Sequence, residues 1–142
     1  MAVVSILLVV IFCVLAGIHF NWALGGRWGF NVALPTKTDG QRVLNPKKID
    51  SAVVGMVLLS FGLFYLFRLG FAPVLLPNWM VEYVGWVVPV IFFARAIGDF
   101  KYVGFFRKVA QTDFSRADAK YFSPLCLLIG LLALGAQLSG YV

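Results

Sequence analysis

The sequence predicts an all-α integral membrane protein, a bundle of four transmembrane helices arranged as two hairpins. Its composition is the first indication: 61% of the 142 residues are hydrophobic and only 13% are charged, whereas soluble domains average about 45–50% apolar and about 25% charged residues. The second is four apolar runs, each long enough to cross a hydrocarbon core of ~30 Å at ~1.5 Å per helical residue. The third is the distribution of positive charge.

Nearly all the basic residues fall in two segments between apolar runs. The first basic segment, residues 27–48, contains Arg27, Lys37, Arg42, Lys47 and Lys48. The second basic segment, residues 95–120, contains Arg95, Lys101, Arg107, Lys108, Arg116 and Lys120. Because cytoplasmic loops are enriched in Lys and Arg, both segments are predicted to be cytoplasmic and both termini to lie outside. This describes a multi-pass protein of the bacterial inner membrane.

The net charge of +6 predicts attraction to anionic lipid headgroups, which bind basic residues next to a membrane span. It does not indicate nucleic acid binding, because the charges flank apolar spans and do not form a stripe on a folded surface.

The four spans are expected at about residues 2–24, 46–67, 79–98 and 120–141. Gly25 and Gly26 end the first span, as glycine does at helix C-termini. Asn45 is a suitable N-cap for the second span, with Pro46 at its first position. Ser115 and Asp118 have the spacing of a capping box, which predicts the start of the last helix.

The second basic segment also shows an amphipathic pattern. Phe100, Val103 and Phe106 recur at helical spacing among basic residues. The pattern predicts a short helix over about residues 100–110 that lies on the membrane surface.

The chain offers few groups for metal or redox chemistry. Cys13 and Cys126 both lie inside apolar runs, where small buried hydrophobic residues are the expected interpretation. A single histidine and two cysteines at different depths do not supply the three or four ligands of a metal centre. No cofactor is therefore expected.

Polar residues near the cytoplasmic ends of the spans are the candidate site. His19 precedes the end of the first span by about five residues, hence ~7 Å at ~1.5 Å per residue. Arg95 lies at a similar depth in the third span, and Asp99 follows it at i+4, where the two side chains could pair. Four further candidates share this depth: Asn21, Trp22, Tyr121 and Ser123.

Each candidate also has a structural interpretation. Arg95 could extend its guanidinium to the headgroups, with Asp99 as its counter-ion. Trp22 and Tyr121 are typical interfacial anchors. His19, the only histidine in the chain, needs a hydrogen-bonding partner if it is buried, and a neighbouring helix could supply one.

Two functional hypotheses follow, with a third less favoured. In the first, a pocket in the cytoplasmic leaflet binds or modifies a lipidic molecule, a quinone, isoprenoid or phospholipid. There His19 would transfer a proton or donate a hydrogen bond, Arg95 would hold an anionic or carbonyl group, and Asp99 would orient Arg95.

In the second hypothesis the protein is a non-enzymatic accessory subunit that docks on a membrane partner or on another copy of itself. Small residues on two helix faces could pack against the partner. The residues are Gly55, Gly62, Gly130 and Gly135. A transporter or channel is less favoured, because no charged residue lies at the centre of a span.

Three sequence strings resemble a known family: His19–Gly26 (HFNWALGG), Arg95–Phe100 (RAIGDF) and Tyr121–Cys126 (YFSPLC). They are similar to a family of small bacterial four-span membrane proteins catalogued only as a domain of unknown function. The resemblance extends over nearly the whole chain. It implies the four-helix fold and implies no activity, ligand or site residue.

Overall fold

The computed structural model describes residues 2–70 and 76–140, and in these ranges the chain is all-α. Its long helices are α1 (Ala2–Ala23), α3 (Lys48–Arg68), α4 (Asn78–Ile97) and α6 (Ser123–Ser139). Three short elements accompany them: α2 (Phe30–Ala33), α5 (Asp113–Ala117) and the π-helix η1 (Asp118–Phe122). Since α5, η1 and α6 follow one another without a break, they form one continuous helical segment from Asp113 to Ser139.

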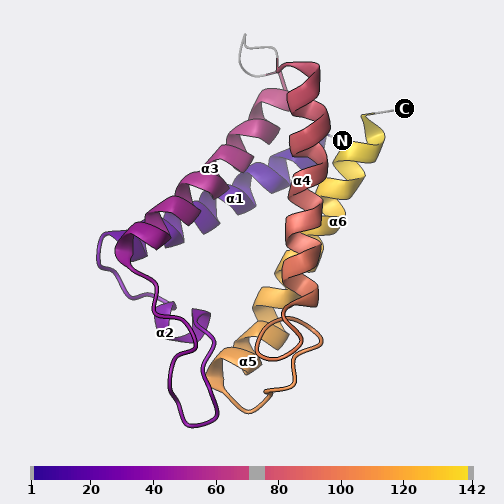
Figure 1. The fold of residues 1–142 in the computed structure, drawn as a ribbon. Coiled ribbons are helices and arrows are strands. Elements are labelled where there is room, and N and C mark those ends of the chain that lie inside the picture. The colour runs from indigo at the N-terminus through magenta and orange to yellow at the C-terminus, as the bar shows by residue number, and fades with distance from the viewer. Residues whose placement is uncertain (1, 71–75, 141–142) are drawn as a thin grey trace.

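The long helices form two hairpins, α1 with α3 and α4 with α6, and α1 also contacts α6 (Figure 1). The core lies where the hairpins meet. Phe12 of α1 is fully buried there, and its ring lies 5.7 Å from the ring of Phe61 and 5.5 Å from that of Phe92, measured between centroids. One aromatic residue of α1 thus contacts a helix of each hairpin.

Glycines allow close packing within each hairpin. A Cβ added to Gly55 would lie 2.9 Å from the ring of Phe20, and one added to Gly130 would lie 2.9 Å from the ring of Phe93. Gly62 is also buried, and a Cβ added to it would lie 3.4 Å from Cβ of Phe12, a looser contact. The space beside these three glycines is therefore filled by side chains of the protein's own helices, and a partner helix could not pack there.

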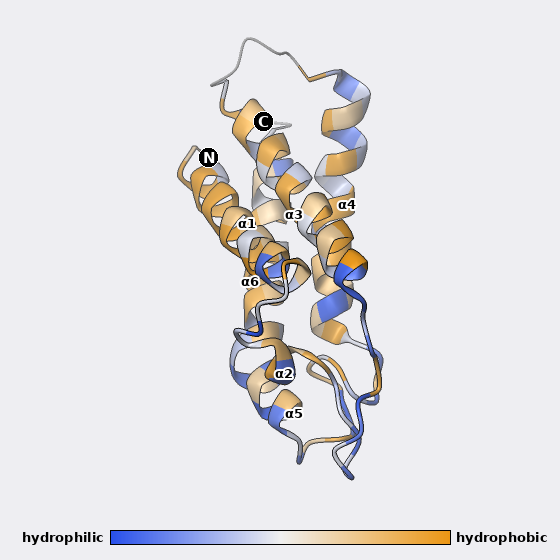
Figure 2. Ribbon diagram, turned by 90° about the vertical axis from the view of Figure 1, so that its left-hand side faces the viewer, coloured by the Kyte–Doolittle hydropathy of each residue, from blue (hydrophilic) through white to orange (hydrophobic). Residues whose placement is uncertain are grey.

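The outer surface of the bundle is apolar. Many large hydrophobic side chains point outwards, among them Val10, Val14, Val53 and Val90, each at least 55% exposed. Figure 2 shows hydrophobic residues along all four long helices, with hydrophilic residues concentrated in the loops around α2 and α5 and also present at the ends of α4. Helices α1, α3 and α4 and the continuous segment Asp113–Ser139 are each long and apolar enough to cross a membrane, so the predicted fold class is confirmed. Both basic segments lie at the end of the bundle opposite the described ends of the chain (Figures 1 and 2).

Several local predictions differ from the structure. Helix α3 begins at Lys48, not at Pro46 after an Asn45 cap, and its first turn is closed by the Lys47 amide, which donates to Oδ2 of Asp50 at 2.7 Å. The predicted end of the last span at Tyr141 lies outside the described residues. Cys13 is exposed on the outer surface of α1, and Cys126 is half-buried, so Cys13 is not a buried residue.

The predicted amphipathic helix over residues 100–110 is also wrong. Residues 98–112 form turns and bends with no helix. Gly98, Phe100 and Gly104 all have positive φ, a conformation incompatible with a right-handed helix. The apolar residues that recur at helical spacing in this segment therefore lie in successive turns and bends of a loop, not along one face of a helix.

The start of the last helical segment was predicted one turn too late. Thr112, not Ser115, is the N-cap: its Oγ1 accepts from the Ser115 amide at 3.0 Å, and Oγ of Ser115 accepts from the Thr112 amide at 3.0 Å. Asp118 therefore has no capping role and lies five residues after Asp113, the first residue of the segment.

Candidate functional site

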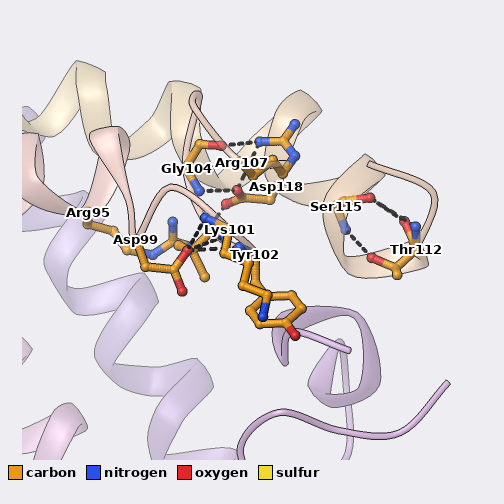
Figure 3. A network of polar contacts seen from close by, with 10 residues as sticks. Arg95, Asp99, Lys101, Tyr102, Gly104, Arg107, Thr112, Ser115 and Asp118 are labelled. Atoms are coloured by element: carbon orange, nitrogen blue, oxygen red, sulfur yellow. Dashed lines mark hydrogen bonds and ion pairs between the residues drawn. The ribbon is translucent and has the colours of Figure 1, made fainter. Parts of the chain in front are cut away.

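Asp118 is the centre of a buried ion cluster (Figure 3). Its carboxylate is completely buried, and Oδ1 accepts from Nη2 of Arg95 at 2.9 Å. Oδ2 accepts from the Gly104 amide at 2.7 Å and lies 3.2 Å from Nη1 of Arg107. The amide of Gly104 adds a third donor to the carboxylate, and further hydrogen bonds of this kind strengthen a buried ion pair. On the guanidinium side, Nη1 of Arg95 and Nε of Arg107 are buried without a hydrogen-bond partner among the described residues.

The cluster fastens the second basic segment to the bundle. Arg95 comes from α4, Asp118 from η1, and Arg107 from the loop between them. Arg107 also donates to the Gly104 carbonyl. Three parts of the chain are therefore held at one carboxylate, in a π-helix, an element that is frequent at functional sites.

Two glycines allow the loop to close on itself. Gly98 and Gly104 have φ of 85° and 89°. A Cβ on Gly98 would lie 2.7 Å from Cα of Gly104, and one on Gly104 would lie 2.6 Å from Cα of Gly98. Only glycine fits such a contact between two backbone segments.

Asp99 binds the loop backbone and does not pair with Arg95. Its Oδ1 accepts from the amides of Lys101, Tyr102 and Val103 at 3.0, 2.8 and 3.0 Å. Desolvation raises the pKa of Asp99, but these backbone donors outweigh it and hold the pKa below its usual range. The prediction of an i, i+4 pair with Arg95 was wrong, because α4 ends at Ile97 and Gly98 turns the chain away from the helix.

His19 and Trp22 form the second part of the candidate site, in the other hairpin. Nδ1 of His19 lies 2.8 Å from the Leu15 carbonyl oxygen of the same helix, so its structural partner is local. The His19 ring meets the Trp22 ring edge-on at 4.8 Å. Nε1 of Trp22 donates to the Trp28 carbonyl at 2.6 Å, and its ring lies 5.6 Å from that of Phe30.

A cavity of about 240 Å³ opens beside Trp22, at the loop end of the α1–α3 hairpin. Two aromatic side chains and four basic ones contribute to its lining: Trp22, Phe30, Arg27, Arg42, Lys47 and Lys48. No carboxylate lines it. Three ion pairs of the described residues, Arg95–Asp118, Arg107–Asp118 and Arg116–Asp113, lie in the second basic segment. None of them includes a basic side chain of this cavity. The cavity is therefore suited to an anionic ligand.

The other predicted site residues are dispersed. Asn21 is exposed on α1, and Tyr121 is 58% exposed on η1. Ser123 is fully buried, and its Oγ makes no hydrogen bond within the described part of the chain. Among the described residues, no contact joins His19 to Arg95, so the structure gives two separate groups where the sequence predicted one belt.

The sequence did not identify the residues at the centre of the ion cluster, nor a buried polar residue in the last span. Asp118 was interpreted as a cap and Arg107 as a surface charge, although Asp118 is buried. Gln137, also buried, was overlooked in the last span: its Oε1 accepts from Nη1 of Arg68 at 3.2 Å, and Nε2 donates to the Val81 carbonyl at 3.4 Å. A polar residue within an apolar span is itself a signal, and it marks here a link between three helices.

The comparison with protein families is decisive for the identity of the chain. The family described as a protein of unknown function, DUF3995, matches residues 12–133. The chain belongs to the DUF3995 family. The matched region contains the whole of both basic segments, with the Asp118 cluster and the basic cavity. No curated protein and no solved structure matches the chain significantly. The family membership supports an integral membrane protein and assigns no activity.

Proposed function

We propose that this DUF3995 protein binds the phosphate group of an anionic lipid in the cavity between Trp22 and Lys48, at the cytoplasmic face of the membrane. The observation that supports the proposal is the lining of that cavity: four basic side chains, two aromatic rings and no carboxylate. The binding of Lys and Arg to lipid phosphates is a general property of basic residues next to a span.

Contacts within the protein position part of the lining. Nη2 of Arg42 donates to Oδ1 of Asn31 at 2.7 Å, and its guanidinium lies 5.3 Å from the centroid of the Phe30 ring. Lys48 begins α3 and extends its ammonium over Gly25, whose φ of 96° turns the chain away from α1. A site with fixed donors binds more tightly because less freedom is lost on binding.

The surroundings of the cavity favour a lipid over a soluble phosphate. Leu24 and Ile49, which adjoin lining residues in the sequence, are 88% and 64% exposed. Trp22 is of the residue type that prefers the membrane interface. A lipid could place its phosphate among the basic residues and its chains against these apolar side chains. A quinone carries no anionic group and is less well matched to this lining.

His19 has a supporting place in this proposal. It lies one helical turn before Trp22 and contacts the Trp22 ring. Its Nδ1 faces the Leu15 carbonyl, which leaves Nε2 as the nitrogen that could meet the ester or first chain atoms of a lipid. Arg95, which pairs with Asp118, acts in the second basic segment and not at this ligand.

A lipid titration tests the proposal. The purified full-length protein would be titrated in detergent with phosphatidic acid and with phosphatidylcholine, and bound lipid would be counted by native mass spectrometry. Phosphatidic acid should bind more tightly. The double variant Lys47→Gln/Lys48→Gln should weaken it by roughly 30-fold, since each basic residue near a membrane surface contributes about 1 kcal/mol and 1.4 kcal/mol is tenfold.

The second basic segment supplies a matched control. Lys101→Gln/Lys108→Gln removes the same charge from two exposed lysines that do not line the cavity, and it should leave the affinity nearly unchanged. Soluble glycerol phosphate should not compete if the lipid chains contribute. Equal binding of the two lipids, or equal losses in the two double variants, would contradict a specific phosphate site.

The accessory-subunit hypothesis has less support. Gly55, Gly62 and Gly130, the residues expected to receive a partner, pack against the protein's own phenylalanines, and Gly135 is half-buried. Channel or transporter activity has no supporting observation among the described residues.

A further inference from the structure

A second cavity, of about 430 Å³, lies between the two basic segments. Its lining differs in chemistry from that of the first cavity. Hydroxyl, amide and carboxylate groups contribute to it: Thr36, Thr38, Thr112, Asn31, Gln111 and Asp113. Such a lining both donates and accepts hydrogen bonds, as a ligand with hydroxyl groups requires.

Arg42 lines both cavities. The Asn31 side chain that fixes its guanidinium lines the second cavity, and the Phe30 ring beneath the guanidinium lines the first. The Arg42 side chain therefore lies between the two cavities and contributes to the lining of each. A phosphate held by Arg42 in the first cavity would have any further headgroup atoms adjacent to the second.

The walls of the second cavity are built by local backbone contacts. In the first basic segment, the Lys37 amide donates to the Gln41 carbonyl at 2.8 Å, and the Val43 amide donates to the Pro35 carbonyl at 2.9 Å. In the second, Thr112 is fixed as the N-cap of α5. Contacts between α2 and α5 bring the two walls together.

We infer that the lipid is a phosphodiester whose headgroup carries hydroxyl groups, such as glycerol or inositol, and that this headgroup occupies the second cavity. The inference rests on the proposed function and specifies its ligand class. The difference in lining carries it. The first cavity offers a phosphate four basic side chains and one amide, that of Asn45. The second has two basic side chains, Lys37 and Arg42, and adds hydroxyl, amide and carboxylate acceptors, among them Asp113, which a hydroxyl group can use and a phosphate cannot.

Headgroup selectivity provides the test. Full-length protein in detergent would be titrated with phosphatidylglycerol, phosphatidic acid and phosphatidylcholine, and bound lipid would be counted by native mass spectrometry. Phosphatidylglycerol should bind about fivefold more tightly than phosphatidic acid for each hydrogen bond that its hydroxyls form. Thr38→Val/Gln111→Ala should remove this preference and leave phosphatidic acid binding unchanged, because both residues are exposed and line only the second cavity.

Gln41→Ala is the matched control, since Gln41 is exposed in the same loop and lines neither cavity. It should behave as the wild type. Equal affinities of the wild type for phosphatidylglycerol and phosphatidic acid would overturn the inference and leave the phosphate site intact. The inference would also be overturned if Thr38→Val/Gln111→Ala lowered the affinity for phosphatidylglycerol and for phosphatidic acid by the same factor. If neither anionic lipid binds better than phosphatidylcholine, the proposed function itself fails, and the inference with it.

Discussion

Replacing Asp118 by Asn should destabilise the fold more than any exposed acidic substitution. The change keeps the size of the side chain and removes the charge that Arg95 and Arg107 share. Removing one partner of a buried ion pair costs about 3–5 kcal/mol, because the remaining charge is left without compensation. Arg107 is only 11% exposed, but Arg95 is 33% exposed and gains some solvation, so the lower end of that range, about 3 kcal/mol, is expected.

The measurement is reversible unfolding of the purified protein in mixed detergent and dodecyl sulfate micelles, followed by circular dichroism. Asp113→Asn is the control, since its pair with Arg116 is exposed on both sides, at 84% and 70%. An exposed pair contributes roughly 0–1 kcal/mol, so this variant should unfold close to the wild type. A loss below about 1 kcal/mol in Asp118→Asn, or equal losses in the two variants, would refute the role assigned to the buried cluster.

Three further predictions concern packing, acid sensitivity and orientation. Gly55→Ala should lower the free energy of unfolding by about 1–3 kcal/mol, because its Cβ would press on Phe20. Gly17→Ala, where nothing lies within 4 Å, should be neutral or stabilise by up to ~1 kcal/mol; similar losses in the two would contradict the close approach of α1 and α3. The pKa of Asp99 is lower in the folded protein than in the unfolded chain, so its carboxylate stabilises the fold. This stabilisation is fully present above the pKa of the unfolded chain, ~3.9, and is lost as the pH falls through the lower pKa of the folded protein. Hydrogen exchange of the Lys101–Val103 amides, corrected for intrinsic rates, should therefore rise on acidification in the wild type and be fast at all pH values in Asp99→Ala; unchanged protection in that variant would be inconsistent with the bonds to Asp99. Epitope tags at either terminus should react with impermeant reagent in intact cells, and protection of both tags would reverse the predicted orientation.

Much of the fold could be predicted from the sequence because its determinants are local or compositional. The spans are continuous apolar runs, and their boundaries carry charged or small residues that membrane helices require. Gly25 illustrates this: a glycine after an apolar run predicted a helix end, and α1 ends two residues earlier, at Ala23. The ends of α3 and α4 differ by one or two residues from the prediction, as expected where caps depend on local geometry. The last helical segment differs more: it begins at Asp113, seven residues before the predicted start at 120, because Thr112 is its N-cap.

The candidate site could be predicted only in part, because its contacts are not local. Arg95 and Asp118 are 23 residues apart in the sequence, and nothing in either neighbourhood identifies the pair. The nearer acid, Asp99, fitted the i, i+4 rule, but that rule holds only while the helix continues, and α4 ends at Ile97. His19 and Trp22 did come together, because both lie on one helix at a spacing of three residues.

The two basic segments have the same sign of charge but different surroundings, and this difference points to different roles. In the second, the described ion pairs bind Arg95, Arg107 and Arg116 to carboxylates, so part of its charge is used to hold the loop on the bundle. In the first, the single acid, Asp39, accepts from the Gln41 amide, and Asp50, just beyond the segment in α3, accepts from the Lys47 amide. None of the described ion pairs includes a basic side chain of the first segment, so these side chains are available to an anionic partner. The number of Lys and Arg residues does not distinguish the two segments, but the positions of the carboxylates do. The ion pairs of the second segment hold its loop on the bundle, and the first segment is therefore the better candidate for binding lipid phosphate.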